Sequence, residues 1–173
     1  MHRFRALADR VRATGDVRRA AALLQQALEL WRGEPFAAGT CDTPWFAALR
    51  DALLRERLTV ELDRNDALMC LGRHARLLDE LPAGLAEHPL DERLAGRFML
   101  ALYRDGRPAR ALAHYEAVRR RLTDELGTDP GPALQRLHQR ILTADAGLDP
   151  APDARRAAPA PRPPAGTGTP LPR

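Results

Sequence analysis

Histidine and cysteine are the residue types in this chain that could bind a metal ion. No histidine is followed four residues later by another, and the two cysteines, Cys41 and Cys70, do not form a CxxC motif. Zinc sites favour both of these arrangements. We therefore predict no metal site and interpret the histidines as surface or packing residues; they are His2, His74, His88, His114 and His138.

Acidic side chains could supply acid–base catalysis, but here they occur as sequential neighbours such as Asp79-Glu80 and Asp91-Glu92. Neighbours on a helix point about 100° apart and do not converge on one substrate atom. The chain also contains no Ser and no Lys, which excludes a serine nucleophile, a Schiff-base lysine and a phosphate-loop lysine. We expect no catalytic residue and no cofactor; an enzyme is kept only as a third alternative.

A repeat of helix pairs is then expected to form the binding surface of the protein. Gly72 and Gly106 lie 34 residues apart, which is the period of a tetratricopeptide helical hairpin. Gly15 opens a third copy, and Pro89 falls where such repeats stop their second helix. We predict that these four residues shape the turns of the repeat, because glycine permits a tight turn and proline cannot continue a helix.

Apolar periodicity predicts an all-α fold made of three helical hairpins and a capping helix. The first helix starts near Phe4 and ends at Thr14-Gly15, and the second runs to about Trp31. Residues 32–43 break the periodicity and are expected to be irregular. The further helices are expected at 44–71, 73–87, 90–104, 107–126 and 132–144, the last being the C-terminal cap.

Composition and charge separate a domain, residues 1–149, from a Pro-, Ala- and Arg-rich tail, residues 150–173, which we expect to be disordered. Residues 1–149 carry 23 Arg against 22 acidic residues, which argues against a large nucleic-acid footprint on the helical domain. No stretch is apolar enough to span a membrane, and the two cysteines are expected to be buried thiols. The protein is expected to be cytoplasmic.

The longer motifs resemble one family. The segments ALELWRGEPF, PWFAALRDALLRERL, HPLDER, LALYRDGRPARAL and LGTDPGPAL resemble, in order, the bacterial transcriptional activator domain of the actinobacterial antibiotic regulatory proteins. The resemblance covers nearly all of residues 4–144, and its most specific part runs from Glu87 to Leu134.

The resemblance implies a tetratricopeptide-like effector domain that follows an N-terminal winged-helix DNA-binding domain. We expect no counterpart of the winged-helix domain in this chain, because Met1 stands at the start of the helical region. We therefore expect DNA binding only through a missing or separate domain. The expected partners are other regulator domains, RNA polymerase, or a second copy of the chain; the alternative function is a free-standing adaptor that binds proteins.

Partner contacts are expected on the concave face of the stack, at Arg64, Leu68 and Arg97. Two other groups of residues are alternative binding surfaces. The basic triplet at 119–121 is interpreted as a salt-bridged surface, with DNA contact as the alternative, because its side chains point in different directions. The aromatic side chains Trp31, Phe36 and Trp45 are interpreted as core packing, with partner binding as the alternative.

Overall fold

The computed structural model describes residues 2–12, 14–31 and 43–149, and these residues form helices and turns without a strand. The helices are α1 (His2–Arg12), α2 (Val17–Glu29), α3 (Pro44–Cys70), α4 (His74–Glu87), α5 (Glu92–Arg104), α6 (Pro108–Leu126) and α7 (Pro132–Leu142), followed by the short 3₁₀ helix η1 (Ala146–Leu148). The all-α prediction is confirmed. The expected irregular segment and the expected tail lie outside the described residues, apart from Thr43.

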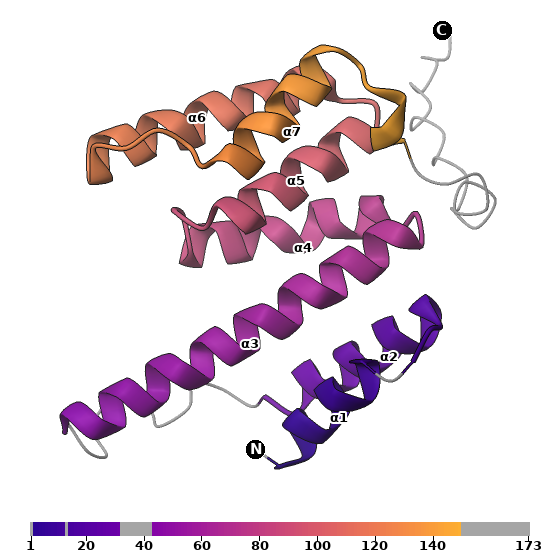
Figure 1. The fold of residues 1–173 in the computed structure, drawn as a ribbon, viewed down its shortest axis with the longest axis vertical. Coiled ribbons are helices and arrows are strands. Elements are labelled where there is room, and N and C mark those ends of the chain that lie inside the picture. The colour runs from indigo at the N-terminus through magenta and orange to yellow at the C-terminus, as the bar shows by residue number, and fades with distance from the viewer. Residues whose placement is uncertain (1, 13, 32–42, 150–173) are drawn as a thin grey trace, which may run out of the picture.

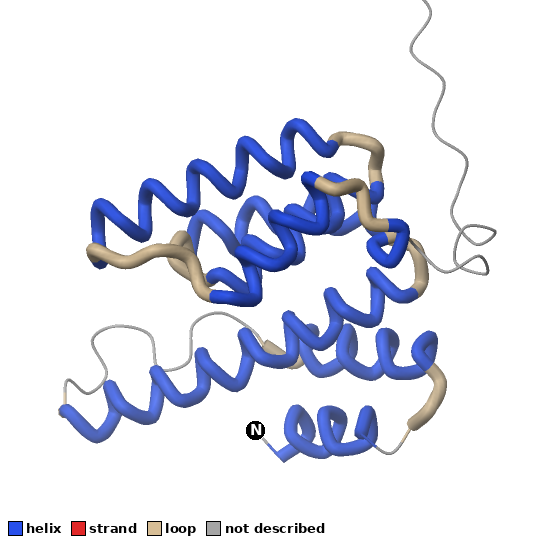
Figure 2. The backbone as a smooth tube through the Cα atoms, turned by 45° about the horizontal axis from the view of Figure 1, so that its top comes forward, coloured by secondary structure: helices blue, strands red, loops and turns tan. Residues whose placement is uncertain are grey.

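Successive helices pack side by side into a stack that runs from α1 to α7 (Figures 1 and 2). The first helices of neighbouring pairs also touch, since α3 contacts α5 and α5 contacts α7. Helix α7 packs on both α5 and α6 and so closes the C-terminal end of the described stack, as a capping helix should.

Local signals in the sequence fix where the helices begin. Asp16 accepts a hydrogen bond from the Arg18 amide, and Asp91 accepts bonds from the amides of Arg93 and Leu94. Proline occupies the first position of α3, α6 and α7, where its missing N–H would have had no helical partner. These caps satisfy backbone donors that would otherwise remain unpaired.

Two predicted glycine turns have the same geometry. Gly72 and Gly106 adopt left-handed conformations, with φ of 69° and 74°. After each one, the next residue's amide bonds back to a carbonyl near the helix end, Arg73 to Leu68 and Arg107 to Leu102. This pattern is a Schellman motif, which needs a residue that tolerates positive φ. Gly15 lies in the α1–α2 turn without a positive φ, and Pro89 lies in the turn after α4.

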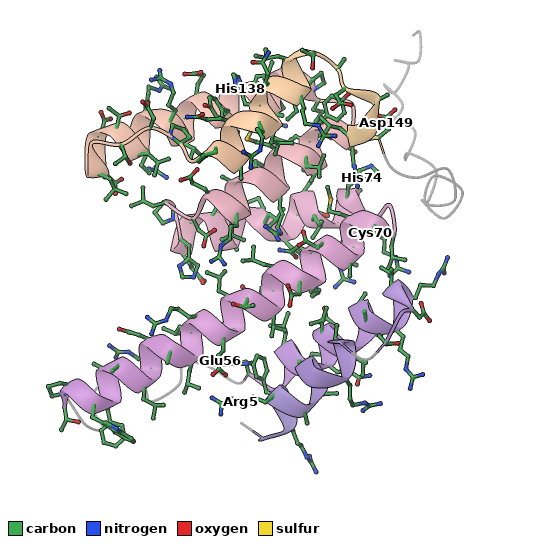
Figure 3. All side chains as sticks on the ribbon, viewed as in Figure 1. Arg5, Glu56, Cys70, His74, His138 and Asp149 are labelled. Atoms are coloured by element: carbon green, nitrogen blue, oxygen red, sulfur yellow. The ribbon has the colours of Figure 1, made fainter. Side chains whose placement is uncertain are left out.

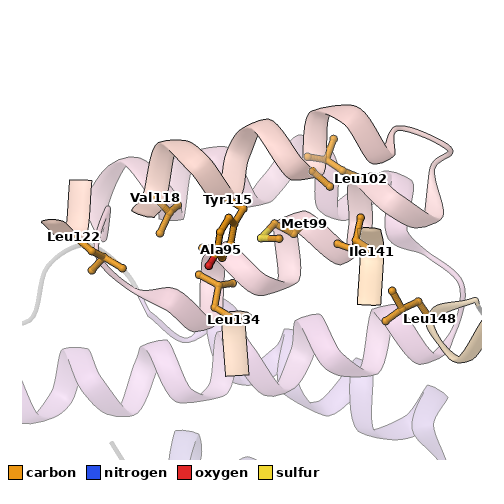
Figure 4. Close-up of a cluster of buried hydrophobic side chains, with 10 residues drawn as sticks. Ala95, Met99, Leu102, Tyr115, Val118, Leu122, Leu134, Ile141 and Leu148 are labelled. Carbon is orange, nitrogen blue, oxygen red and sulfur yellow. The ribbon is translucent and has the colours of Figure 1, made fainter. Parts of the chain in front are cut away.

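The core is divided along the stack. One cluster lies among α1, α2 and α3 and includes Phe4 and Leu24. A second cluster includes Leu68 and Leu77, and a third joins α5, α6 and α7 around Met99 (Figure 4). Because each helix pair buries its apolar face only against its neighbours, the fold is held by successive local interfaces.

Two predictions about single side chains are wrong. Trp45 is 66% exposed, because the first turns of the 27-residue α3 extend beyond its neighbours and its buried residues begin only at Leu53 (Figure 1). Cys70 is exposed, because it is the last residue of α3. Trp31 packs edge-on against Phe4 at 5.5 Å, in line with the core interpretation. Phe36 and Cys41 lie outside the described residues.

The turn after α7 contains a residue that is poorly suited to its backbone. Ala144 has a φ of 48°, and the amides of Ala144 and Asp145 close the same Schellman pattern that glycine closes elsewhere. A left-handed conformation costs an L-residue with a side chain roughly 1 kcal/mol relative to glycine.

We predict that Ala144→Gly raises the free energy of unfolding by about 0.5–1 kcal/mol, measured by urea denaturation. The control is Ala113→Gly at an exposed position inside α6, which should lower it by about 1 kcal/mol. If both variants changed the free energy of unfolding in the same direction, this would contradict the left-handed geometry of the turn.

Candidate protein-interaction grooves

The three residues predicted to contact a partner occupy three different environments. Leu68 is 3% exposed and belongs to the second core cluster, the one that includes Leu77, so it has almost no surface that a partner could contact. Arg64 lines a groove among α2, α3 and α4. Arg97 lines a second groove among α3, α5 and α7. The structure therefore does not gather the three side chains at one site.

The first groove, of about 340 Å³, is polar and is crossed by Arg64. The Arg64 side chain donates from Nε to the Gln25 side chain at 2.6 Å and forms an ion pair with Glu80 at 2.7 Å. Glu80 also pairs with Arg76 at 2.6 Å. Hydrogen bonds from these two arginines hold the pKa of Glu80 below its ordinary value, although burial acts in the opposite direction as the largest single influence.

The role of Arg64 is to connect helices. Its guanidinium is buried, with the residue 8% exposed, and it links α3 to α2 through Gln25 and to α4 through Glu80. A buried guanidinium is tolerated only when its donors are satisfied. This side chain is therefore part of the scaffold that fixes the groove.

The second groove, of about 290 Å³, has mostly apolar walls. We call it the α5–α7 groove; it is lined by Asp66 of α3, by Glu92, Arg93, Gly96, Arg97 and Leu100 of α5, and by Ala133, Leu134 and Leu137 of α7. We call the apolar part of this lining, together with Gly96, the floor, and its charged part, formed by Asp66, Glu92, Arg93 and Arg97, the edge. Its volume lies near the lower limit of small-molecule pockets, which suits a single inserted side chain.

Ion pairs fix the charged edge of the α5–α7 groove. Arg97 pairs with Asp66 at 2.5 Å and also donates to the backbone carbonyl of Arg93 at 3.1 Å. The Nε of Arg97 is covered yet has no acceptor. A donor left without a partner is unfavourable, so Arg97 is held less completely than Arg64.

Glu92 sets the position of α7 at the other end of this groove. Its carboxylate accepts a hydrogen bond from the Gly131 amide at 2.6 Å. A Cβ on residue 131 would lie 3.3 Å from a Glu92 oxygen, which is tighter than most such contacts. The Asp-Pro-Gly-Pro corner thus docks the start of α7 directly on the start of α5, an effect that residue periodicity did not indicate.

Gly96 was not predicted from the sequence as a groove residue either, although an isolated glycine inside a helical pattern is a recognised signal. It lies inside α5, and a Cβ added there would meet Leu134 and Leu137 of α7 at 3.6 Å, an ordinary van der Waals distance. Alanine would therefore fit without a clash. A helix-interior glycine costs roughly 1 kcal/mol relative to alanine, so α5 gives up stability at a position on the groove floor.

The salt-bridged interpretation of the basic triplet agrees with the ion pairs of Arg119 and Arg121, whereas Arg120 donates to the backbone carbonyl of Glu116. Arg119 pairs with Glu116 at 3.0 Å, and Arg121 lies 3.6 Å from Glu125. These exposed pairs contribute little stability, and they balance charge on this face of α6.

Two of the histidines pack against aromatic rings, and His88 is exposed. His138 stacks on Tyr115 at 3.8 Å between ring centroids, and His114 packs edge-on against Phe98 at 4.9 Å. Figure 3 shows His138 on α7 and His74 on α4 as separate positions. Among residues 2–12, 14–31 and 43–149, no group of three or more His, Cys, Asp or Glu is placed to hold a metal ion. None of the described helices is long and apolar enough to cross a membrane.

Comparison with known proteins gives consistent matches. The family model described as "Bacterial transcriptional activator domain" matches residues 1–142. Regulatory protein AfsR of Streptomyces coelicolor is 48% identical over 141 residues, which are 82% of this chain and 14% of AfsR. Regulatory protein DnrI of Streptomyces peucetius is 41% identical over 138 residues, which are 78% of this chain and 49% of DnrI.

A solved structure has the same fold. Mycobacterium tuberculosis EmbR, determined in complex with a low-affinity phosphopeptide, superimposes with a TM-score of 0.74 at 28% identity. The match covers 90% of this chain and 39% of that one. This chain therefore corresponds to a part of each of these longer regulators.

We predict that Arg64→Met lowers the free energy of unfolding by about 1–3 kcal/mol, because the bonds to α2 and α4 are lost together. The control is Arg76→Met, which removes the more exposed partner of Glu80 and should cost less than about 0.5 kcal/mol. Urea denaturation measures both. Equal effects would contradict the connecting role of Arg64.

We expect two histidines, His74 and His114, to make stability depend on pH. Burial lowers the pKa of His114, with a further contribution from Arg121, and burial also lowers the pKa of His74. The unfolded chain binds these protons near pH 6.5 and the folded chain only at lower pH, so their contribution is fully present above about pH 6.5 and is lost as the pH falls below it.

We therefore expect the free energy of unfolding to decrease from pH 6.5 to pH 5, above the range in which the carboxylates titrate. His114→Leu should flatten that decrease, as measured by denaturation at fixed pH values. His88→Gln, at an exposed position, is the control. A slope that His114→Leu leaves unchanged would contradict the assignment.

Proposed function

The chain belongs to the bacterial transcriptional activator domain family, and we propose that it regulates transcription by docking a partner protein in the α5–α7 groove. The relatives it matches are transcriptional regulators, and it spans 14% of AfsR and 49% of DnrI. Its part of the activity is the effector part, and recognition of a promoter sequence requires a winged-helix domain outside this chain.

Gly96 is the observation that carries this proposal. The fold gains nothing from glycine at this position, because alanine would be compatible with both the helix and the neighbouring leucines. A methyl group on residue 96, which lines the groove beside Leu134 and Leu137, would however take up part of the groove's volume. Binding sites commonly retain features that lower stability.

The groove favours a protein segment with one leucine-sized apolar side chain followed by an acidic residue. The apolar floor would contact the partner's apolar side chain, and Arg97 would pair with the partner's acidic residue. Asp66, the present ion-pair partner of Arg97, has a side chain that is 55% exposed, so a partner's carboxylate would compete with it for the guanidinium. The candidate partners are another regulator domain, RNA polymerase and a second copy of the chain.

We assign no enzymatic activity to the chain, and we place it in the cytoplasm, where a bacterial regulator meets DNA and polymerase. Domain bounds of 1–149, with a separate tail at 150–173, complete this proposal. The free-standing adaptor remains the alternative function, and the experiment below distinguishes the two.

We predict that Gly96→Ala raises the free energy of unfolding by about 0.5–1 kcal/mol and yet reduces activation. Ala133→Trp, at an exposed position in the groove lining, should abolish activation without unfolding the protein. The measurement is the level of the transcripts that depend on residues 1–144, defined by deleting those codons from the native gene.

Matched controls are Gly84→Ala, a helix-interior glycine on α4, and Ala113→Trp, an exposed alanine on α6. Both should leave transcript levels unchanged. Full activation by Ala133→Trp would contradict the groove as the docking site. If deletion of residues 1–144 changes no transcript, the activator function itself fails and the adaptor takes its place.

A further inference from the structure

The small net charge of the domain conceals a strongly basic end. Residues 2–19 contain six arginines and two aspartates, although residues 1–149 as a whole carry 23 Arg against 22 acidic residues. The excess of positive charge is therefore concentrated in α1 and the beginning of α2. The remaining part of the domain is slightly acidic.

The α1–α2 hairpin brings part of this charge together. Arg10 lies in the last turns of α1, and Arg18 and Arg19 lie in the first turn of α2, so all three are at the same end of the hairpin. All three are exposed. Side chains tipped with nitrogen extend from this pair of helices away from α3 in Figure 3. We call these three residues the basic end.

The basic end differs in its pairing from the basic triplet of α6 and from Arg5. Arg119 pairs with Glu116, and Arg5 pairs with Glu56 of α3 at 2.7 Å. By contrast, within the described ranges no salt bridge is formed by Arg10, Arg18 or Arg19. The nearest acid in sequence, Asp16, accepts a hydrogen bond from the Arg18 amide as the cap of α2.

The fold gains nothing from this placement. Arginine in the first turn of a helix is electrostatically unfavourable, because that turn carries partial positive charge, and at the start of α2 two arginines stand beside a single acidic side chain, the cap Asp16. Like charges at one end of a hairpin also repel each other. An anion outside the domain would compensate for both effects.

We propose that Arg10, Arg18 and Arg19 contact the phosphate backbone of DNA without reading its sequence. Duplex DNA presents closely spaced negative charges that arginine neutralises with release of counterions. Such contacts position a regulator on the duplex and leave sequence recognition to another domain. The basic end lies on α1 and α2 and the partner groove on α3, α5 and α7, so the two surfaces can be occupied together and tested separately.

The test measures binding of the purified chain to two 20-base-pair duplexes of unrelated sequence by fluorescence anisotropy, from 50 to 200 mM salt. The unmodified chain should bind both duplexes equally, with an affinity that falls steeply as salt rises. In Arg10→Gln/Arg18→Gln/Arg19→Gln, the slope of log Kobs against log salt should decrease by up to about 2.7, which is about 0.9 per lost phosphate contact, and the affinity at 50 mM salt should fall at least about tenfold.

The control variant is Arg73→Gln/Arg110→Gln/Arg136→Gln, which removes the same charge from exposed positions on other elements. It should bind like the unmodified chain. Equal losses in both variants would overturn the proposal, because net charge would then explain the binding. Displacement of the duplex by polyglutamate at an equal concentration of charge would also overturn it, since the basic end would then bind acidic proteins.

Folding is checked independently. The triple variant at the basic end should unfold at a temperature no lower than that of the unmodified chain, because it removes unfavourable charges. Transcript changes caused by Ala133→Trp test the groove and are unaffected by the outcome at the basic end.

Discussion

The Arg64 guanidinium is the interaction on which the arrangement of the N-terminal half depends. The long helix α3 packs against α2 on one side and reaches the α4–α5 region on the other. The core clusters on those two sides are separate. Between them, Arg64 binds Gln25 of α2 and Glu80 of α4 at the same time. A directional polar contact thus sets the spacing of helices where apolar packing alone would allow several arrangements.

A comparable contact sets the C-terminal half. Arg104, near the end of α5, donates to the carbonyls of Met69 at 2.9 Å and Leu148 at 2.7 Å, and so holds the end of α3 and the 3₁₀ helix together. Burial lowers the pKa of this guanidinium from its high ordinary value. Because Arg104 and Glu92 fix opposite ends of α5, the floor of the α5–α7 groove lies on a helix that is anchored at both ends. A rigid floor favours a pre-organised binding site.

The sequence predicted the helices better than it predicted the grooves, for a physical reason. Helix limits are set by local signals, such as Asp16, Pro44 and Gly72, that act within a turn of the residue concerned. Grooves are set by contacts over long distances in the chain, such as Glu92 to Gly131 and Arg97 to Asp66. Repeat register alone placed Leu68 on an accessible face, whereas the close approach of α4 and α5 buries it.

The distribution of charge shows the same difference between average and local properties. From composition, a nearly neutral domain is not expected to approach DNA closely. Electrostatic attraction falls off over about 8–10 Å at physiological salt, so a phosphate near α1 responds to the arginines around it and hardly to the acidic residues on α6. A repeat protein is long compared with this distance. Its two ends can therefore act on different partners, and net charge alone does not determine the nature of either partner.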